Sequence, residues 1–228
     1  MVPEKQITPI RIKFSKVGDL MYISHLDLAR TMQRIMLLSG IDIWYSEGFN
    51  PQPKIVFAVP LPVGVESECE LMDIKINTPM SCEEIKERLE RNFPEEMKVL
   101  DVYVPETKLK GISYIDYTIN IYTQGEIYDL GLDILFLFRE ECRIMKKTKS
   151  GEKEINVSEY IKLLELIDPS DCITLHAIFE ADGDRYLNPE LFIQALRQNL
   201  GILSPDSYNE HYTIMRNKML DSNLEEFK

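Results

Sequence analysis

The sequence predicts an α+β protein with two tandem ferredoxin-like units, each in the order βαββαβ with an antiparallel sheet. Three observations support this. Segments with strand and helix periodicity alternate as strand, helix, strand, strand, helix, strand in the first half. A polar stretch that begins with proline, residues 105–111, then interrupts the order. The same order recurs beyond it, which predicts domains at residues 1–107 and 108–228.

The first half gives clear element boundaries. Residues 10–16 alternate apolar and polar side chains, as a half-buried strand does. Ser24 and Asp27 form a variant of the capping box that begins a helix, and Gly40 is a typical stop for it. The other expected elements are strands at residues 41–45, 55–59, 70–76 and 99–104 and a helix that begins at Ser81.

The second half repeats this pattern more loosely. Its last eight residues, 221–228, are polar, and we expect them to fray. The expected elements are strands at residues 114–122, 172–180 and 212–220, helices at 127–139 and 189–200, and a hairpin at 143–156. The recurrence of helices between strands is the basis for predicting a duplicated unit.

Composition narrows the class of protein. The chain has 228 residues, 44% of them hydrophobic and 28% charged, which is typical of a soluble globular protein. No apolar run reaches the roughly 18–20 residues that span a bilayer, and the start lacks a secretory signal. We therefore expect a cytoplasmic protein without a membrane partner.

The net charge of −12 disfavours a protein that coats nucleic acid non-specifically, because phosphates would be repelled. The charge is uneven along the chain. Residues 1–64 hold seven Lys/Arg and five Asp/Glu, a net +2, whereas residues 65–228 hold 19 and 33, a net −14. An anionic partner is therefore expected to meet the first quarter.

Motifs for cofactors and catalysis are missing from the sequence. The four cysteines at 69, 82, 142 and 172 are isolated, so they are interpreted as small buried apolar residues, with no metal site and no iron–sulfur cluster. The glycine-rich phosphate loops, the zinc-protease motif and the serine-hydrolase elbow do not occur. We expect no cofactor, and these absences favour a non-catalytic protein while leaving the question of an enzyme open.

The helix start SHLDLAR is the first candidate site. Asp27, Arg30 and Arg34 follow helical spacing and share one polar face. His25 lies in the first turn, where the helix dipole disfavours the imidazolium form, so a neutral imidazole could donate to a phosphate or act as a base. The alternative is a solvated face with an Asp27–Arg30 ion pair.

The stretch WYSEGFNPQPK, residues 44–54, is the second candidate site. It is long and stiff for a strand connection, since it contains two prolines and three aromatic residues. Its rings could stack on bases, and its short polar groups and lysine could hold a ligand. The alternative is a rigid hairpin whose aromatic residues cover the sheet edge. The candidate binding residues are Tyr45, Ser46, Phe49, Asn50 and Lys54, and we expect them to share one cleft with the helix start.

Two stretches carry a family resemblance: residues 11–34, RIKFSKVGDLMYISHLDLARTMQR, and residues 45–64, YSEGFNPQPKIVFAVPLPVG. They resemble the uncharacterised radical SAM-linked proteins, which occur fused to or encoded beside a radical S-adenosylmethionine (SAM) enzyme. The resemblance implies a radical SAM enzyme as partner and a connection to RNA metabolism. Because the chain lacks C-x-x-x-C-x-x-C, a partner would perform any radical chemistry.

Three hypotheses about function follow. The first is a non-catalytic accessory module that binds RNA, including transfer RNA, for a separate radical SAM enzyme. Arg30 and Arg34 would hold phosphate, and Tyr45 and Phe49 would stack a base. The second is a metal-independent ribonuclease-like enzyme that uses His25 as acid or base. The third is an adaptor whose acidic second half binds another protein.

Overall fold

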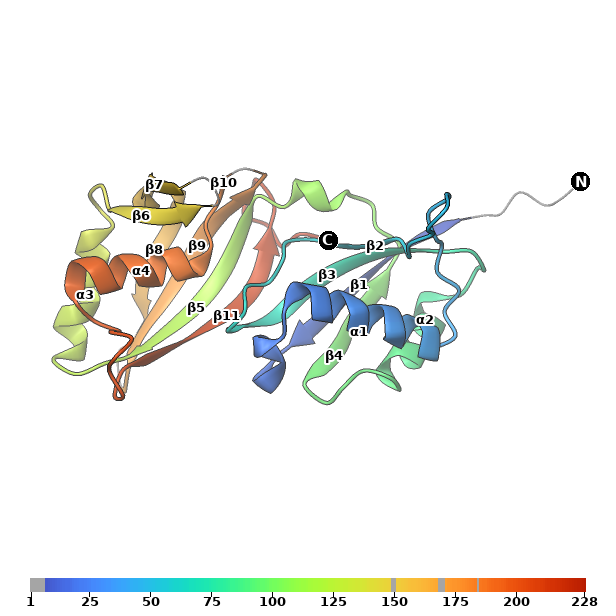
Figure 1. The fold of residues 1–228 in the computed structure, drawn as a ribbon, viewed down its shortest axis with the longest axis horizontal. Coiled ribbons are helices and arrows are strands. Elements are labelled where there is room, and N and C mark those ends of the chain that lie inside the picture. The colour runs from blue at the N-terminus through green and yellow to red at the C-terminus, as the bar shows by residue number, and fades with distance from the viewer. Residues whose placement is uncertain (1–6, 149–150, 168–170, 184) are drawn as a thin grey trace, which may run out of the picture. The chain divides into compact units, whose positions relative to one another are not determined.

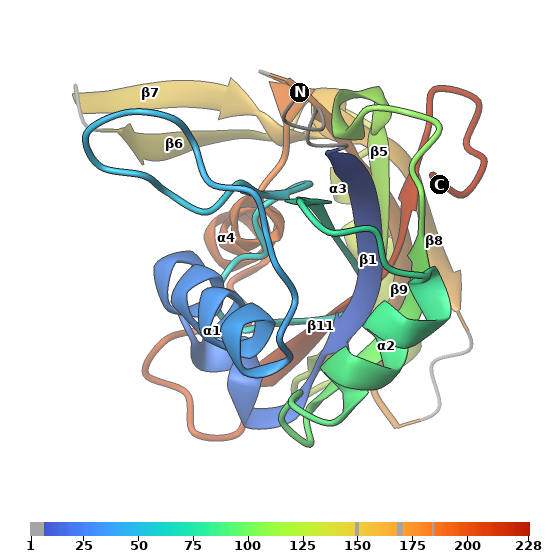
Figure 2. The same cartoon turned by 90° about the vertical axis from the view of Figure 1, so that its right-hand side faces the viewer.

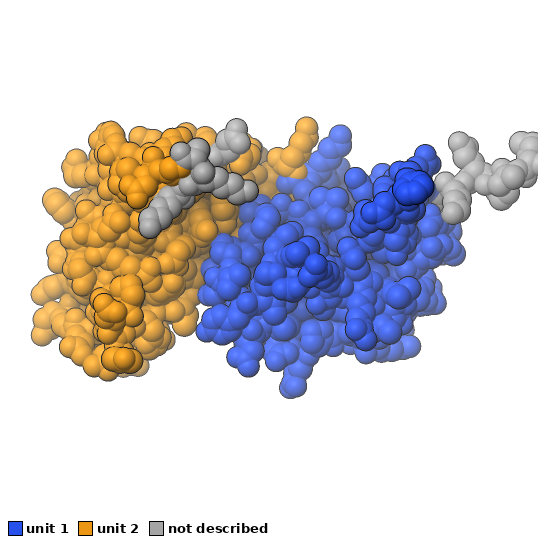
Figure 3. All heavy atoms as spheres, in the orientation of Figure 1, with its two compact units in different colours: residues 1–109, 228 blue, residues 110–227 orange. Residues whose placement is uncertain are grey.

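The structure is a computed structural model that describes residues 7–148, 151–167, 171–183 and 185–228 (Figure 1). The chain divides into two compact units, residues 1–109 with Lys228 and residues 110–227 (Figure 3). Each unit combines helices with antiparallel strand pairs. The predicted α+β class is therefore confirmed.

Unit 1 has three well-formed strands, one short strand and two helices. Strand β1 lies between β4 and β3, and β2 pairs with β3 on its other edge, so that Ile74 faces Ile10 and Ile55. The short 3-10 segment η2 (Leu109–Gly111) follows β4. The elements are β1 (Thr8–Lys16), η1 (Gly18–Tyr22), α1 (His25–Leu38), β2 (Ile55–Phe57), β3 (Val65–Ile76), α2 (Cys82–Glu90) and β4 (Met97–Tyr103).

Helix α1 begins and ends where the sequence predicts. Its first turn is capped by Ser24, whose Oγ accepts from the Asp27 N–H at 3.2 Å and donates to Asp27 Oδ2 at 2.7 Å. Gly40 follows the last turn at φ +63°, a left-handed conformation that glycine adopts without strain. The buried stripe Leu28, Met32, Ile35 and Met36 packs on β1 and β3 in the core of this unit.

The strand expected at residues 41–45 does not form. This segment makes only isolated bridges, Ile43 with Ile76 and Tyr45 with Pro53. Ile41 and Ile43 are buried in the core, so their apolar alternation reflects side-chain burial and not membership of the sheet. The strand expected at 55–59 is limited to the three residues of β2.

The sheet face of unit 1 away from the helices carries a buried arginine. Arg11 is fully buried and donates two hydrogen bonds to Asp73, at 2.6 and 2.9 Å. It also donates to the Thr107 carbonyl at 2.9 Å. Thr107 in turn donates its hydroxyl to the carbonyl of Lys228 at 2.5 Å, which explains why the last residue belongs to this unit.

Unit 2 has a sheet in the order β11-β5-β9, with β8 and β10 both paired to β9. Strands β6 and β7 form a separate two-stranded ribbon (Figure 2). The elements are β5 (Tyr114–Tyr122), α3 (Ile127–Leu137), β6 (Arg143–Thr148), β7 (Gly151–Asn156), η3 (Val157–Tyr160), β8 (Ile161–Ile167), β9 (Ile173–Asp182), β10 (Arg185–Tyr186), α4 (Pro189–Leu200) and β11 (His211–Leu220).

The expected hairpin at residues 143–156 is formed by β6 and β7, while its turn at 149–150 lies outside the described residues. The sequence does not predict β8, one of the strands that pair with β9. Its register against β9 shifts between Ile161 and Leu163. This irregularity breaks the period-two alternation by which a strand is recognised.

The last residues are held in place, contrary to the expected fraying. Phe227 is buried and its N–H donates to the Met219 carbonyl at 2.9 Å. Leu220 and Glu226 form an isolated bridge. A Cβ added at Gly111 would lie 3.0 Å from the Phe227 ring, so glycine makes room for this aromatic anchor. The polar composition of this segment does not reveal the one ring that fixes it.

Two expectations from composition can be compared with the structure. Cys69 and Cys142 are buried as expected, whereas Cys82 and Cys172 are only half-buried. Within the described residues, none of the helices combines the length and the apolar character that a bilayer crossing requires.

Candidate functional site

The first turn of α1 holds a chain of polar contacts. Asp27 Oδ1 accepts from Arg30 at 3.3 Å, and Asp27 Oδ2 accepts from Ser24 Oγ at 2.7 Å. Both oxygens of Asp27 therefore have partners within the helix start. Arg30 and Asp27 are both largely exposed, so the ion pair contributes little to stability.

His25 contacts strand β2 and not the loop of residues 44–54. Its ring lies edge-on to Phe57, with 5.1 Å between ring centroids and an interplanar angle of 79°. The imidazole is exposed beyond this contact. None of the described carboxylates lies within ion-pair distance of His25, so the structure gives it no partner that would orient it as a base.

Residues 44–54, which we call the aromatic loop, are closed at the base by backbone hydrogen bonds. The Lys54 N–H donates to the Trp44 carbonyl at 3.0 Å, and the Ser46 N–H donates to the Gln52 carbonyl at 2.8 Å. Ser46 Oγ accepts from the Gln52 N–H at 3.0 Å. Lys75 lies over the Trp44 ring, 5.5 Å from its centroid. The base is thus anchored on β3.

The aromatic loop presents two of its rings to solvent, Phe49 at its tip and Tyr45 at its base. Phe49 is fully exposed and Tyr45 is 46% exposed. Gly48, at φ +132°, turns the chain at this point. Asn50 and Lys54 are exposed as well. In the fully described stretch 7–148, the side chains of Tyr45, Phe49, Asn50 and Lys54 make no hydrogen bond, ion pair or ring contact.

The helix start and the aromatic loop do not converge in one cleft, so that expectation is wrong. The loop follows the end of α1, and in Figure 1 it lies beyond the C-terminal end of the helix. A helix of 14 residues separates the two pieces by roughly 20 Å at about 1.5 Å per residue. No hydrogen bond or ion pair joins them within residues 7–148. Arg34 lies two turns beyond His25, nearer to the loop.

A polar cluster in unit 2 is not among the candidate sites predicted above, because His176 follows Leu175 in an apolar strand pattern, which predicts a core histidine. His176 Nε2 lies 2.8 Å from Asp116 Oδ2, and Nδ1 lies 3.5 Å from Glu165 Oε2. Asn217 donates to Asp116 Oδ1 at 2.8 Å. The side chains come from four strands, which only the register of the sheet brings together. Polar residues at alternate positions of β5 and β9 were the available signal.

Both nitrogens of His176 face carboxylates. Burial lowers its pKa, but the hydrogen bond and charge of Asp116, joined by those of Glu165, outweigh burial and raise the pKa above its ordinary value. The arrangement favours an imidazolium held between two carboxylates. No ring nitrogen is left for a substrate, so the cluster is better suited to stabilising the sheet than to acid–base chemistry.

Comparison with protein families gives a match over most of the chain. The model of the family described as "Uncharacterized protein conserved in bacteria (DUF2344)" matches residues 9–189. The chain belongs to this family. The match includes the helix start, the aromatic loop and the β6–β7 ribbon. Comparison with curated proteins gave no match.

The solved structures that match the chain share little sequence with it. A chain of the "Cbf5-Nop10-Gar1 Complex" has a TM-score of 0.47 and 10% identity, and the match covers 92% of this chain and 48% of that one. The chain thus spans about half the length of the chain that it matches in that complex. An "Unknown Protein from Galdieria sulphuraria" has a TM-score of 0.27 and 9% identity over 92% and 99% of the two chains. DyPB from Rhodococcus jostii RHA1 has a TM-score of 0.21 and 11% identity, and the match covers 87% of this chain and 85% of that one.

Proposed function

We propose that the protein is a cytoplasmic RNA-binding accessory protein without catalytic activity of its own, which acts beside a separate radical SAM enzyme. The two units serve as two ferredoxin-like domains, residues 1–107 and 108–228. This fold assignment is supported by the element order, which is βαββαβ in each unit once the β6–β7 ribbon and the short β10 are set aside. The partner follows from the resemblance in residues 11–64.

The observation that carries the proposal is the aromatic loop. Its base is fixed by backbone hydrogen bonds, and it exposes Tyr45 at this base and Phe49 at its tip. Burying a large apolar side chain stabilises a fold by about 1.5–3 kcal/mol, and an exposed ring does not make this contribution. Stacking of a base on an aromatic ring contributes about 1–3 kcal/mol per base. A pre-formed loop with free rings therefore suits unpaired bases.

Charge favours single-stranded RNA over a duplex. The net charge of −12 disfavours binding to the dense phosphates of a double helix, so stacking has to supply most of the affinity. Arg34 and Lys54 are exposed, and their side chains have no partner within residues 7–148. They are available for phosphate oxygens, while Arg30 is shared with Asp27. The proposed footprint runs from the loop toward Arg34.

The test is the fluorescence anisotropy of a labelled single-stranded RNA of mixed sequence, titrated with the full chain. We expect the double variant Tyr45→Ala/Phe49→Ala to bind at least about tenfold more weakly, since one or two stacked bases are lost. Tyr208→Ala is the matched control, because Tyr208 is an equally exposed aromatic residue of unit 2. No RNA binding by the wild type, or equal losses in both variants, would refute the proposal.

Two further outcomes would change the proposed function. A transfer RNA that binds no better than the single-stranded RNA would limit the ligand to unpaired segments in general. RNA cleavage in the absence of metal, lost in His25→Ala, would replace the proposal with the ribonuclease hypothesis. The contact of His25 with Phe57 and its lack of an orienting carboxylate argue against that outcome.

A further inference from the structure

Helix α3 exposes a stripe of large apolar side chains. Tyr128, Leu132 and Phe136 follow one another at intervals of four residues and are 59%, 44% and 68% exposed. The opposite side of the helix packs into unit 2 through Gly131 and Ile134. The helix is therefore apolar on two faces, although only one of them is needed for the fold. Exposed apolar patches of this kind mark interaction surfaces.

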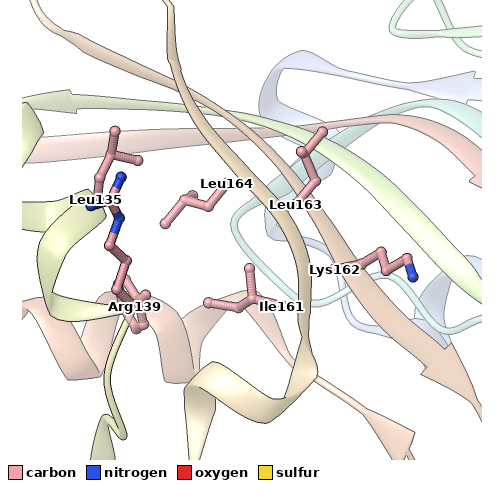
Figure 4. A pocket seen from close by; sticks show the side chains of 7 residues that line it. Leu135, Arg139, Ile161, Lys162, Leu163 and Leu164 are labelled. Carbon is pink, nitrogen blue, oxygen red and sulfur yellow. The ribbon is translucent and has the colours of Figure 1, made fainter.

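A cavity of about 230 Å³ extends the stripe at one edge. It lies between the end of α3 and the start of β8, and it is lined by apolar side chains, including Leu135, Ile161 and Leu164, and by Arg139 and Lys162. Figure 4 shows Leu135 and Arg139 on one side, with Ile161 and Leu164 extending toward them, while Lys162 points away. The cavity can accept one apolar side chain of a ligand that lies along α3.

The other edge of the stripe is acidic. Asp129 and Asp133 are exposed and four residues apart, so they lie one above the other on the helix. Neither carboxylate has a hydrogen bond or an ion pair with any described residue. The surface thus consists of an apolar stripe with a cavity on one side and two uncompensated negative charges on the other.

We infer that this surface, the α3 stripe, binds a basic amphipathic α-helix of another protein. Such a helix lays apolar anchors at i, i+3, i+4 and i+7 into a groove, and here they would meet Tyr128, Leu132 and Phe136. The 11 residues of α3 give a contact length of about 16 Å, which matches about three turns of a partner helix. Lysine or arginine beside those anchors would pair with Asp129 and Asp133.

The charges distinguish this partner from other occupants. Residues 110–227 contain 12 Lys/Arg and 21 Asp/Glu, a net −9, which repels anionic lipid and nucleic acid. In a symmetric contact between two copies, the same patch faces itself, so Asp129 and Asp133 would approach their own equivalents. A cationic helix is instead attracted by the net negative charge of residues 110–227. The inference does not depend on RNA binding by the aromatic loop.

The test uses the full chain and two synthetic helical peptides of about 18 residues. Both have one leucine face, and their polar flanks are lysine in one and glutamate in the other. Anisotropy titrations measure each affinity. We expect the wild-type chain to bind the lysine peptide more tightly than the glutamate peptide. The variant Leu132→Ser/Phe136→Ser should bind the lysine peptide at least about tenfold more weakly than the wild type does. Leu37→Ser/Leu38→Ser, which alters two exposed leucines of α1, is the matched control.

A charge reversal makes the test decisive. In Asp129→Lys/Asp133→Lys the preference should switch from the lysine peptide to the glutamate peptide. Equal binding of both peptides, no binding of the lysine peptide, or unchanged preference in this variant would overturn the inference. A dimer in sedimentation velocity that dissociates in Leu132→Ser/Phe136→Ser would overturn it too. RNA affinity should be the same in Leu132→Ser/Phe136→Ser as in the wild type, which separates the two proposals.

Discussion

His176 is the residue whose environment differs most from its sequence context. It follows Leu175 in an apolar strand and is predicted as a core histidine, yet its ring lies between Asp116 and Glu165. Burial lowers its pKa, and the two carboxylates raise it by more. In the unfolded chain the carboxylates are dispersed, so the pKa of His176 returns to about 6.5.

The raised pKa gives stability a pH dependence of known sign. The folded state binds the proton more tightly, so His176 contributes its full stabilisation below the unfolded pKa and loses it as pH rises through the folded pKa. Urea denaturation at a series of pH values from about 5.5 to 8.5 should show this decline in the free energy of unfolding. His176→Gln should reduce the decline, whereas His25→Gln should keep it. An unchanged decline in His176→Gln would contradict the assignment.

Side-chain contacts within one helix can be predicted from residue spacing, whereas contacts between distant segments cannot. The ion pair of Asp27 with Arg30 follows from helical spacing and forms as the alternative interpretation states. The partner of His25 does not follow from spacing, because Phe57 is 32 positions away in the chain and meets it only through β2. Ligand binding remains a prediction for all the candidate residues: His25, Asp27, Arg30, Arg34, Tyr45, Ser46, Phe49, Asn50 and Lys54.

Helix ends are the elements that local sequence determines best. Ser24 and Ser81 cap α1 and α2 with the same bond, in which the serine Oγ accepts from the N–H three residues on. Gly201 ends α4 in the left-handed conformation, at φ +67°. Each of these features depends on a few neighbouring residues, which is why the sequence predicts such caps and stops.

Gly201 offers a clean measurement of this local control. A Cβ at this position would meet nothing within 4 Å, so the cost of Gly201→Ala is conformational. We expect it to lower the free energy of unfolding by about 1–2 kcal/mol, because alanine disfavours the left-handed region. Gly201→Asn should cost less, since asparagine tolerates that region better. Chemical denaturation of both variants is the measurement, and equal stability of alanine and glycine would show that the helix end rearranges.

Strands were predicted less well than helix ends. Residues 41–45 have the alternation of a strand but lie beside the sheet with isolated bridges. Residues 161–167 form a strand without that alternation, because the register against β9 shifts. Pairing partners and bulges decide both cases, and neither is encoded within the segment itself.

At the scale of the whole molecule, charge limits how RNA can be bound. The chain has a net charge of −12, and the cations near the proposed footprint are Arg30, Arg34 and Lys54. Each phosphate neutralised on a single strand adds about −0.7 to the slope of log affinity against log salt. Two to three contacts therefore predict a slope between about −1 and −2.

A salt series in the anisotropy titration checks this slope. Arg34→Gln should make it shallower by about 0.7, whereas Arg143→Gln should leave it unchanged. Arg143 is a suitable control because it is already paired with Glu141 and Glu154 in unit 2. A slope steeper than about −4 would show that RNA lies on a wider cationic surface than the aromatic loop and α1 provide.

The sequence by itself determined the α+β class and the residues at which α1 begins and ends. It also singled out a loop whose prolines and aromatic residues are unusual for a strand connection. These are properties of short segments, and short-range sterics and hydrogen bonds control them. Only the tertiary structure decided that the loop and the first turn of α1 lie at opposite ends of a helix, and that His176 meets two carboxylates. Those distances depend on chain direction and strand register, which residues far apart in the sequence set together.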